Sequence, residues 1–241
     1  RVLPPFFEHK YRIVWSKTEL TQTADEIQHP KVREAIRFCN ISSGLEIHYD
    51  GDLPAQTGLG TSSAFTVGML HALYTLKSIM PSKLRLGKEA IHIEQNILKE
   101  NVGCQDQLAC AFGGLNHIKF FQGDTQISPV ILSKERQEEF RSHLLLLFTG
   151  FARDASEITG EQIKEIPGHT SELLEMRDMV HQGLYVLRSN MELKEFGKLI
   201  DRSWQLKKRL SPRITNDSID SSYEKALNCG ADGGKLLGAV G

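Results

Sequence analysis

The spacing of apolar residues predicts several short strands and longer helices in the first part of the chain. Alternating apolar and polar residues predict strands at residues 11–16 and 45–49. Apolar residues at helical spacing predict helices at residues 30–39, 62–76 and 87–98. Pro30 suits the first position of its helix, because the amide hydrogen that proline lacks is not needed there.

The pattern changes towards the end of the chain, where helices dominate. Shorter runs predict strands at residues 115–120 and 129–132, a polar helix at 134–141 and a buried strand at 144–149. Three longer segments with helical periodicity follow at residues 171–188, 193–210 and 218–229. Strands crowd the first half and helices the second, which favours an α+β protein with two lobes over regular βαβ alternation.

Composition and charge narrow the class of protein. The chain has 241 residues, of which 40% are hydrophobic and 24% charged, as is usual for a globular protein. The 29 basic and 30 acidic residues give no electrostatic indication of a nucleic acid or an anionic membrane as partner. None of the cysteines forms a C-x-x-C pair, and the longest apolar run, residues 144–148, is too short to cross a bilayer. We therefore expect reduced thiols and a cytoplasmic protein.

Both ends of the sequence have an unusual character for a complete domain. The chain starts at Arg1 and enters a Pro4-Pro5 pair almost at once. It ends inside a glycine-rich run at residues 230–241, although such runs normally lead into a further element. We therefore expect a chain that is truncated at both ends.

The most informative segment is a glycine loop between a predicted strand and a predicted helix. Gly58 and Gly60 allow a sharp turn and leave no side chain between the backbone amides and a ligand. Thr61, Ser62 and Ser63 supply hydroxyls where the helix begins, and the free amides of a helix start favour a phosphate. Taken alone, the same residues also fit a tight turn with Thr61 or Ser62 as a simple N-cap.

Common phosphate-binding motifs do not account for this loop. A P-loop needs a lysine and then a hydroxyl residue after its last glycine, and no lysine follows Gly60 in this loop. Elsewhere in the sequence Lys235 does follow Gly234, but the next residue is Leu236 and carries no hydroxyl. Ser63 stands where a dinucleotide fingerprint needs its third glycine, and no G-x-S-x-G hydrolase elbow occurs.

The loop resembles the central motif of the GHMP kinases, the superfamily of galacto-, homoserine, mevalonate and phosphomevalonate kinases. The residues that carry this resemblance are Pro54, Gly58, Leu59, Gly60, Thr61, Ser62, Ser63 and Ala64. In that family the loop wraps the phosphates of ATP, so the resemblance implies that residues Pro54 and Gly58 to Ser63 bind the nucleotide. It also implies that Ser62 reaches Mg²⁺, the second cofactor.

Two acidic residues follow the loop in the order that the family shows. Glu94 lies in a predicted helix and Asp106 shortly before the Gly113-Gly114 pair. The resemblance implies that Glu94 binds Mg²⁺ and that Asp106 polarises the substrate hydroxyl as a base. Taken singly, Glu94 also fits an exposed helix glutamate and Asp106 a helix cap.

Further stretches resemble one branch of the family, the kinases of D-glycero-D-manno-heptose 7-phosphate. They are residues 101–107, 148–156 and 204–210. A sugar phosphate needs a cationic clamp, for which Arg153 is a candidate, although a surface arginine paired with Asp154 or Glu157 fits equally. Gly114 is the second candidate for substrate contact. The basic run at residues 207–209 is explained by dipole complementarity at a helix end.

The end of the sequence resembles the start of the third GHMP motif. In the family this glycine-rich loop folds back beside the nucleotide loop; here Val240 stands where glycine is usual. The family's first motif, with its basic residue, has no counterpart in the sequence.

Together these features predict a two-lobed GHMP kinase fold. Residues 1–131 should form a lobe of the ribosomal-protein S5 domain 2 type, and residues 132–241 a helix-rich lobe like the ferredoxin-like half of the family, with ATP in the cleft between them. The predicted reaction places phosphate on the anomeric hydroxyl of heptose 7-phosphate, giving the 1,7-bisphosphate. The alternatives are a kinase for fucose, galactose or a uronic acid, or a non-catalytic sugar sensor. The sequence leaves the oligomeric state open.

Overall fold

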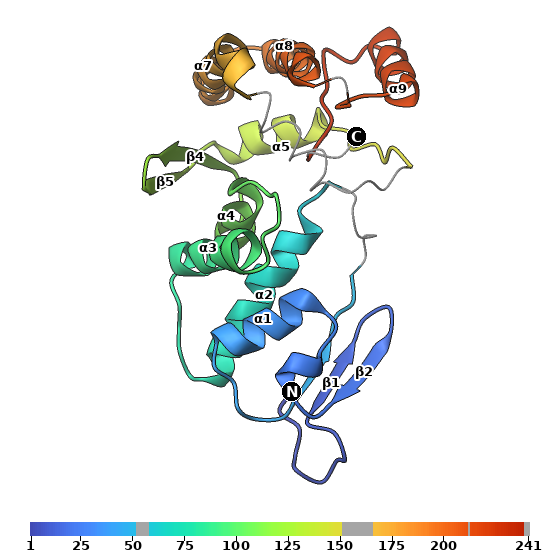
Figure 1. Ribbon diagram of the computed structural model, residues 1–241. Coiled ribbons are helices and arrows are strands. Elements are labelled where there is room, and N and C mark those ends of the chain that lie inside the picture. Colours follow the sequence, from blue (N-terminus) through green and yellow to red (C-terminus); the bar gives the residue numbers. More distant parts are fainter. Residues whose placement is uncertain (52–57, 151–165, 212, 239–241) are drawn as a thin grey trace. The chain divides into compact units, whose positions relative to one another are not determined.

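The computed structural model describes residues 1–51, 58–150, 166–211 and 213–238 (Figure 1). These residues belong to two compact units, one of Arg1–Ala55 with Gly60–Gly113 and one of Gln56–Leu59 with Gly114–Gly241. The strands β4 and β5, which we expected in the first lobe, group with the second unit. The division into family domains at residue 131 stays a prediction.

The first unit contains a sheet of three short strands in the order β2-β1-β3. The central strand β1 (Tyr11–Val14) is antiparallel to β2 (Thr18–Thr21) and parallel to β3 (Leu45–His48). The sequence pattern did not predict β2, because its inward-facing residue is the buried Glu19. The Glu19 carboxylate accepts a hydrogen bond of 2.8 Å from Trp15 Nε1, so a polar residue takes the place of an apolar one.

Helices pack against this sheet and bury its apolar side. The helix α1 (Pro30–Phe38) starts with the predicted proline, and α2 (Thr61–Leu76) is the longest helix of the unit. A single-turn 3₁₀ helix, Ala24–Glu26, precedes α1. The core joins strand and helix residues, among them Tyr11, Ile13, Ile36, Leu45, Leu70 and Leu73. Burying such side chains is the main source of stability for a unit of this kind.

The predicted helix at residues 87–98 has two parts. The helix α3 (Lys83–Ile91) continues without a break into a π-helical turn, His92–Ile97. The helix α4 (Gln105–Phe112) then packs on α3, where a Cβ at Gly87 would lie 2.7 Å from Leu108 Cδ2. Glycine thus allows the two helices to approach closely at this point.

The second unit begins with a hairpin of β4 (Asn116–Phe121) and β5 (Asp124–Pro129). Gly123, with φ +82°, provides the left-handed residue of the turn. The prediction of a second strand at residues 129–132 is wrong, because the tight turn starts β5 at Asp124 and the strand ends where we expected it to begin. The helix α5 (Lys134–Ser142) follows, capped by Ser133 as its sequence predicts.

The buried strand predicted at residues 144–149 is also wrong. Residues 144–148 form neither helix nor strand, and their side chains are exposed, Leu145 by 82%. A strand needs a partner for its backbone groups, and among the described residues none pairs with this segment.

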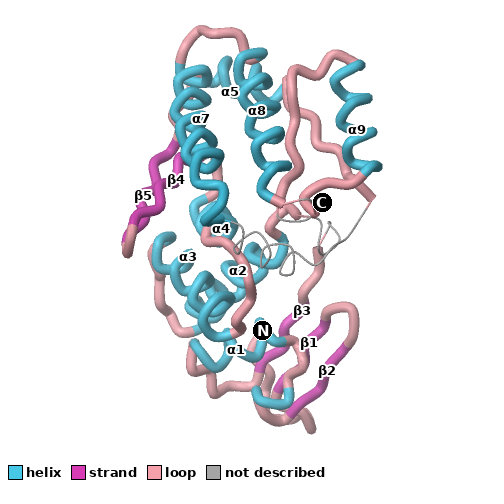
Figure 2. Tube along the Cα trace, turned by 45° about the horizontal axis from the view of Figure 1, so that its top comes forward, coloured by secondary structure: helices cyan, strands magenta, loops and turns pink. Residues whose placement is uncertain are grey.

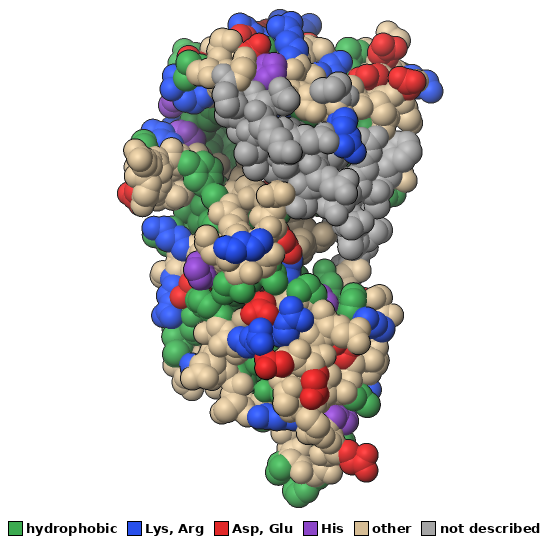
Figure 3. Space-filling model, in the orientation of Figure 1, with side chains coloured by type: hydrophobic (Ala, Val, Ile, Leu, Met, Phe, Trp, Pro, Cys, Tyr) green, Lys and Arg blue, Asp and Glu red, His purple; other side chains and the backbone are tan. Residues whose placement is uncertain are grey.

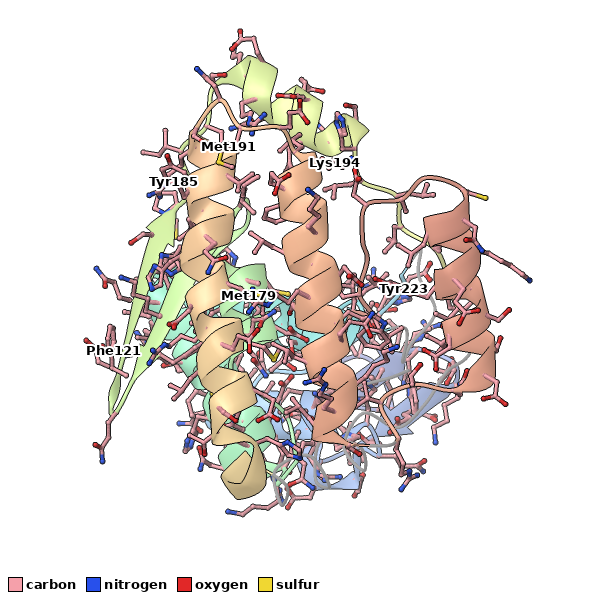
Figure 4. All side chains as sticks on the ribbon, turned by 90° about the horizontal axis from the view of Figure 1, so that it is seen from above. Phe121, Met179, Tyr185, Met191, Lys194 and Tyr223 are labelled. Atoms are coloured by element: carbon pink, nitrogen blue, oxygen red, sulfur yellow. The ribbon has the colours of Figure 1, made fainter. Side chains whose placement is uncertain are left out.

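The remaining helices fulfil the predictions to within about a residue. They are α7 (Thr170–Arg188), α8 (Lys194–Leu210) and α9 (Asp217–Asn228), with a short 3₁₀ turn, Ile166–His169, before α7. The helices α7 and α8 lie side by side, with the buried Met179 on α7 (Figures 2 and 4). Towards α9, Trp204 is buried beside Ile214 and Ile219, and Tyr223 points at α8.

The surface of the first unit mixes charges of both signs on the face shown in Figure 3. This arrangement agrees with the balanced composition of the chain. In the part of the chain that the structure describes, no helix is long and apolar enough to cross a membrane.

Candidate active site

The glycine loop leads directly into the N-terminus of α2. Gly60 occupies the N-cap position in the left-handed conformation, with φ +72°, and no side chain caps the helix. Thr61 and Ser62 lie within the first turn, so the N-cap role considered for them is not what the structure has. Ser62 is exposed, and its hydroxyl has no hydrogen-bond partner among the described residues. The first amides of α2 are therefore free to bind an anion.

Asp106 lies against this helix start. A Cβ at Gly60 would be 3.5 Å from Oδ2 of Asp106. The aspartate lies inside the first turn of α4 and does not cap it, because Cys104 holds the N-cap position without a side-chain bond. Burial raises the pKa of Asp106, and the nearby Glu94 carboxylate raises it further. The structure thus brings together Gly60 and Asp106, which are far apart in the sequence.

Glu94 is held at the centre of a buried polar network. It lies in the π-helical turn, a rare form that occurs mostly at functional sites, and its side chain is fully buried. Oε1 accepts hydrogen bonds from Lys31 Nζ at 2.8 Å and Thr66 Oγ1 at 2.7 Å. Oε2 accepts one from Ser63 Oγ at 3.2 Å and another from Gln107 Nε2. The network joins α1, α2 and α4 through one carboxylate.

Lys31 supplies the charge that makes this burial possible. Its ammonium also contacts Glu100 at 2.9 Å, and its side chain is only 10% exposed. Burial alone would raise the pKa of Glu94, but the Lys31 charge and the hydrogen bonds outweigh it and hold that pKa below its usual value. Sequence reasoning missed Lys31, because a lysine in an amphipathic helix normally faces solvent and this one pairs with a residue 63 positions away.

This geometry tests the metal site expected from Ser62 and Glu94. The hydroxyl that bonds Glu94 belongs to Ser63, while that of Ser62 points to no described partner. Both Glu94 oxygens already accept two hydrogen bonds each, so the arrangement does not fit Glu94 as a magnesium ligand while Lys31 stays in place. One buried oxygen beside it, Oε1 of Gln107, has no hydrogen-bond partner among the described residues. Within residues 1–51, 58–150, 166–211 and 213–238, no cluster of three His, Cys, Asp or Glu could hold a metal.

The other expected site residues are distributed as follows. Pro54 and Arg153 lie outside the described residues. Gly58 has φ +73°, and a Cβ on Gly238 would lie 2.9 Å from its Cα, so these two glycines lie against each other. Gly114 follows α4 with φ +73°, a left-handed conformation that favours glycine, so the backbone alone accounts for a glycine here. A contact between Gly114 and the substrate stays a prediction.

The family comparison fits this architecture. Residues 14–114 match the model described as GHMP kinases N terminal domain. This stretch contains the glycine loop, Glu94 and Asp106. This stretch is similar to the GHMP kinase N-terminal domain, and it makes up less than half of the chain.

Individual relatives extend the comparison beyond that domain. The chain is 29% identical to D-glycero-alpha-D-manno-heptose 7-phosphate kinase of Campylobacter jejuni, over 81% of this chain and 58% of that protein. It is 26% identical to the bifunctional fucokinase/GDP-fucose pyrophosphorylase of Arabidopsis thaliana, over 83% of this chain and 19% of that protein. It is 23% identical to a galactokinase of Pyrococcus furiosus, over 81% of this chain and 62% of that protein. The chain thus spans less than two thirds of the length of these relatives.

Solved structures share the fold. A D-glycero-D-manno-heptose 1-phosphate kinase from Bacteroides thetaiotaomicron superposes with a TM-score of 0.67 at 24% identity, covering 95% of this chain and 69% of that one. The galactokinase of Lactococcus lactis, complexed with galactose, gives 0.65 at 16% identity, covering 99% of this chain and 74% of that one. The chain has the mixed helix and sheet fold of these solved kinases.

Proposed function

We propose that this chain carries the catalytic site of an ATP-dependent sugar kinase. The observation that supports this most is the uncapped start of α2 with the Asp106 carboxylate directly beside it. The free amides offer a place for the phosphates of ATP, and the carboxylate offers a base for the acceptor hydroxyl. An N-terminus that bound nothing would more commonly carry a side-chain cap.

The reaction needs a hydroxyl oxygen to attack the γ-phosphorus of ATP. A new P–O bond forms, the bond to the ADP oxygen breaks, and the hydroxyl proton passes to Asp106. The raised pKa of Asp106 brings the carboxylate closer to the proton affinity that a base needs at neutral pH. Glu94 holds this carboxylate in place indirectly, because it fixes Gln107, the next residue of α4.

The acceptor that we propose is the anomeric hydroxyl of heptose 7-phosphate, which would become the 1,7-bisphosphate. The heptose 7-phosphate kinase relative, at 29% identity over 81% of this chain, supports this choice. Fucose and galactose are the second candidate class, because fucokinase and galactokinase relatives cover a similar share of this chain.

ATP is the donor that the family uses, and we propose Mg²⁺ as its counter-ion. Ser62 has the free hydroxyl that such an ion could use. Glu94 could join it only if Lys31 first moved away from Oε1. Nucleotide affinity with and without Mg²⁺, measured for Ser62→Ala, tests this assignment.

The test of the function is ADP release with a panel of acceptors. Heptose 7-phosphate, unphosphorylated heptose, fucose and galactose are each supplied with ATP, and Asp106→Asn serves as the matched variant of similar shape. Turnover that depends on heptose 7-phosphate and falls in Asp106→Asn supports the proposal. Nucleotide binding without turnover on any sugar would contradict it and favour a sensor.

A further inference from the structure

The three basic residues at the end of α8 have different surroundings. Lys208 is paired with Asp220 at 3.5 Å and lies over the ring of Trp204. Arg209 is exposed. Lys207 instead turns towards the glycine-rich end of the chain, where Nζ donates to the carbonyl of Gly238 at 2.7 Å and lies 3.5 Å from that of Leu236. The attraction between a lysine and the C-terminal end of its own helix does not explain why Lys207 contacts the carbonyls of Leu236 and Gly238.

Lys207 lies near a second cation, Lys235, and no described carboxylate forms an ion pair with it. Burial of its ammonium, together with the nearby charge of Lys235, lowers the pKa of Lys207 to about 8. Lys235 is exposed at the surface, so its ammonium keeps much of its hydration. Over the described ranges, neither lysine forms an ion pair with an aspartate or a glutamate. Lys207 is only partly buried. Two neighbouring cations without an anion repel each other, and a bound anion would relieve this repulsion.

The backbone around these lysines is built from glycine turns. Gly238 has φ +73° and packs so closely on Gly58 that a side chain on it would touch Gly58 Cα at 2.9 Å. The ring of Tyr223 would lie 3.3 Å from a Cβ on Gly234, and Tyr223 itself donates a hydrogen bond to Asp201 of α8 at 2.5 Å. The segment that carries Lys235 is therefore held firmly against α8. Such turns expose backbone amides that add to the attraction for an anion.

We propose that Lys207 and Lys235 bind a phosphate ester group beside Gly58 and Gly238. The chemistry is that of a dianion held by two ammonium groups, each able to give charge-assisted hydrogen bonds. The bound group belongs either to the nucleotide or to the phosphorylated sugar, an assignment that rests on the proposed function. Arg153 is not required for this site.

The experiment measures binding of inorganic phosphate, ATP and heptose 7-phosphate by calorimetry at constant ionic strength. Lys207→Met and Lys235→Met remove one ammonium each and keep most of the side-chain volume. Each should weaken phosphate binding about tenfold or more, since hydrogen bonds between charged groups are worth that much. Lys208→Met is the matched control one residue along the helix, and it should leave binding unchanged.

The two esters distinguish the sources of the phosphate. Weaker ATP binding alone assigns the site to the nucleotide, and weaker heptose 7-phosphate binding alone assigns it to the sugar; either supports the site. The proposal is overturned if both lysine variants bind all three ligands like the wild type, or if Lys208→Met loses as much. Lys207→Arg should restore binding, which separates loss of charge from loss of fold.

Failure of the proposed function gives a different result. If the wild type transfers phosphate to no sugar but still binds inorganic phosphate through Lys207, the kinase proposal fails and the anion site stands.

Discussion

Replacing Lys31 by methionine should destabilise the first unit strongly. The substitution keeps an unbranched apolar stem and removes the cation that contacts the fully buried Glu94. Glu94 would then keep its hydrogen bonds from Ser63, Thr66 and Gln107 but lose the opposite charge. A buried carboxylate without a counter-charge is among the costliest defects in a folded protein.

The size of the effect follows from the burial of both partners. The side chains of Lys31 and Glu94 are 10% and 1% exposed, so solvent screens their attraction little. Breaking a buried pair by removing one partner costs about 3–5 kcal/mol of unfolding free energy. Because three hydrogen-bond donors to Glu94 remain, we expect a loss of about 3 kcal/mol for Lys31→Met. Burial would raise the pKa of Glu94 in the variant. The loss should therefore be largest at neutral pH and shrink on acidification, when protonation removes the uncompensated charge.

The assay is urea unfolding followed by tryptophan fluorescence. The chain has two tryptophans, Trp15 in the first unit and Trp204 in the second, so a Trp204→Phe background reports the first unit alone. Lys88→Met, an exposed lysine on α3, is the control. Glu94→Gln and the double variant complete a cycle in which the two losses should be far from additive.

The reasoning fails if Lys31→Met changes the free energy of unfolding by no more than Lys88→Met does. Surface substitutions stay within about 0.5 kcal/mol, so the two outcomes are well separated. Additive losses in the cycle would likewise show that Lys31 and Glu94 do not interact.

Three further predictions concern the candidate active site. Asp106→Asn should lower single-turnover phosphate transfer about 10²- to 10⁴-fold with unchanged ATP affinity, and wild-type activity should fall on acidification at a pH above the usual aspartate range, because the base must be deprotonated. Gly60→Ala should cost about 1–2 kcal/mol in urea unfolding, since its φ is +72°. Mg²⁺ alone should raise the urea midpoint of Lys31→Met but not that of the wild type, because only the variant leaves Oε1 of Glu94 open to the ion. Equal shifts in both proteins would show that Mg²⁺ does not bind at Glu94.

The sequence predicted the long helices well because their apolar faces repeat over several turns. The bounds of α2, α7 and α8 lie within about a residue of the expected ones, and the glycine loop stands before α2 as expected. Short elements were harder to predict. The strand β2 turns a glutamate inwards, so its pattern carries no apolar alternation. The apolar run at residues 144–148 indicated burial, but burial depends on a neighbouring surface that the run itself does not encode.

In the candidate site, residues that belong to a local motif could be predicted from the sequence, whereas contacts between distant segments could not. Gly60 and Asp106 could be named from the sequence, and the structure brings them together; their roles stay predictions. The pairing of Lys31 with Glu94 could not be named, because it depends on how α1 packs beside the π-helical turn. The hydrogen bond from Ser63 to Glu94 could not be predicted either, because it depends on the rotation of α2 about its axis, which a motif does not specify.

The exposed apolar side chains of residues 144–148, four leucines and Phe148, affect the colloidal behaviour of the protein. Five consecutive apolar side chains, without a charge or a proline among them, present a ready contact for the same segment of another molecule. Self-association should therefore begin at this segment when the purified chain is concentrated. A single lysine in place of Leu146, whose side chain is 64% exposed, would interrupt the run at little cost to the folded state and delay precipitation.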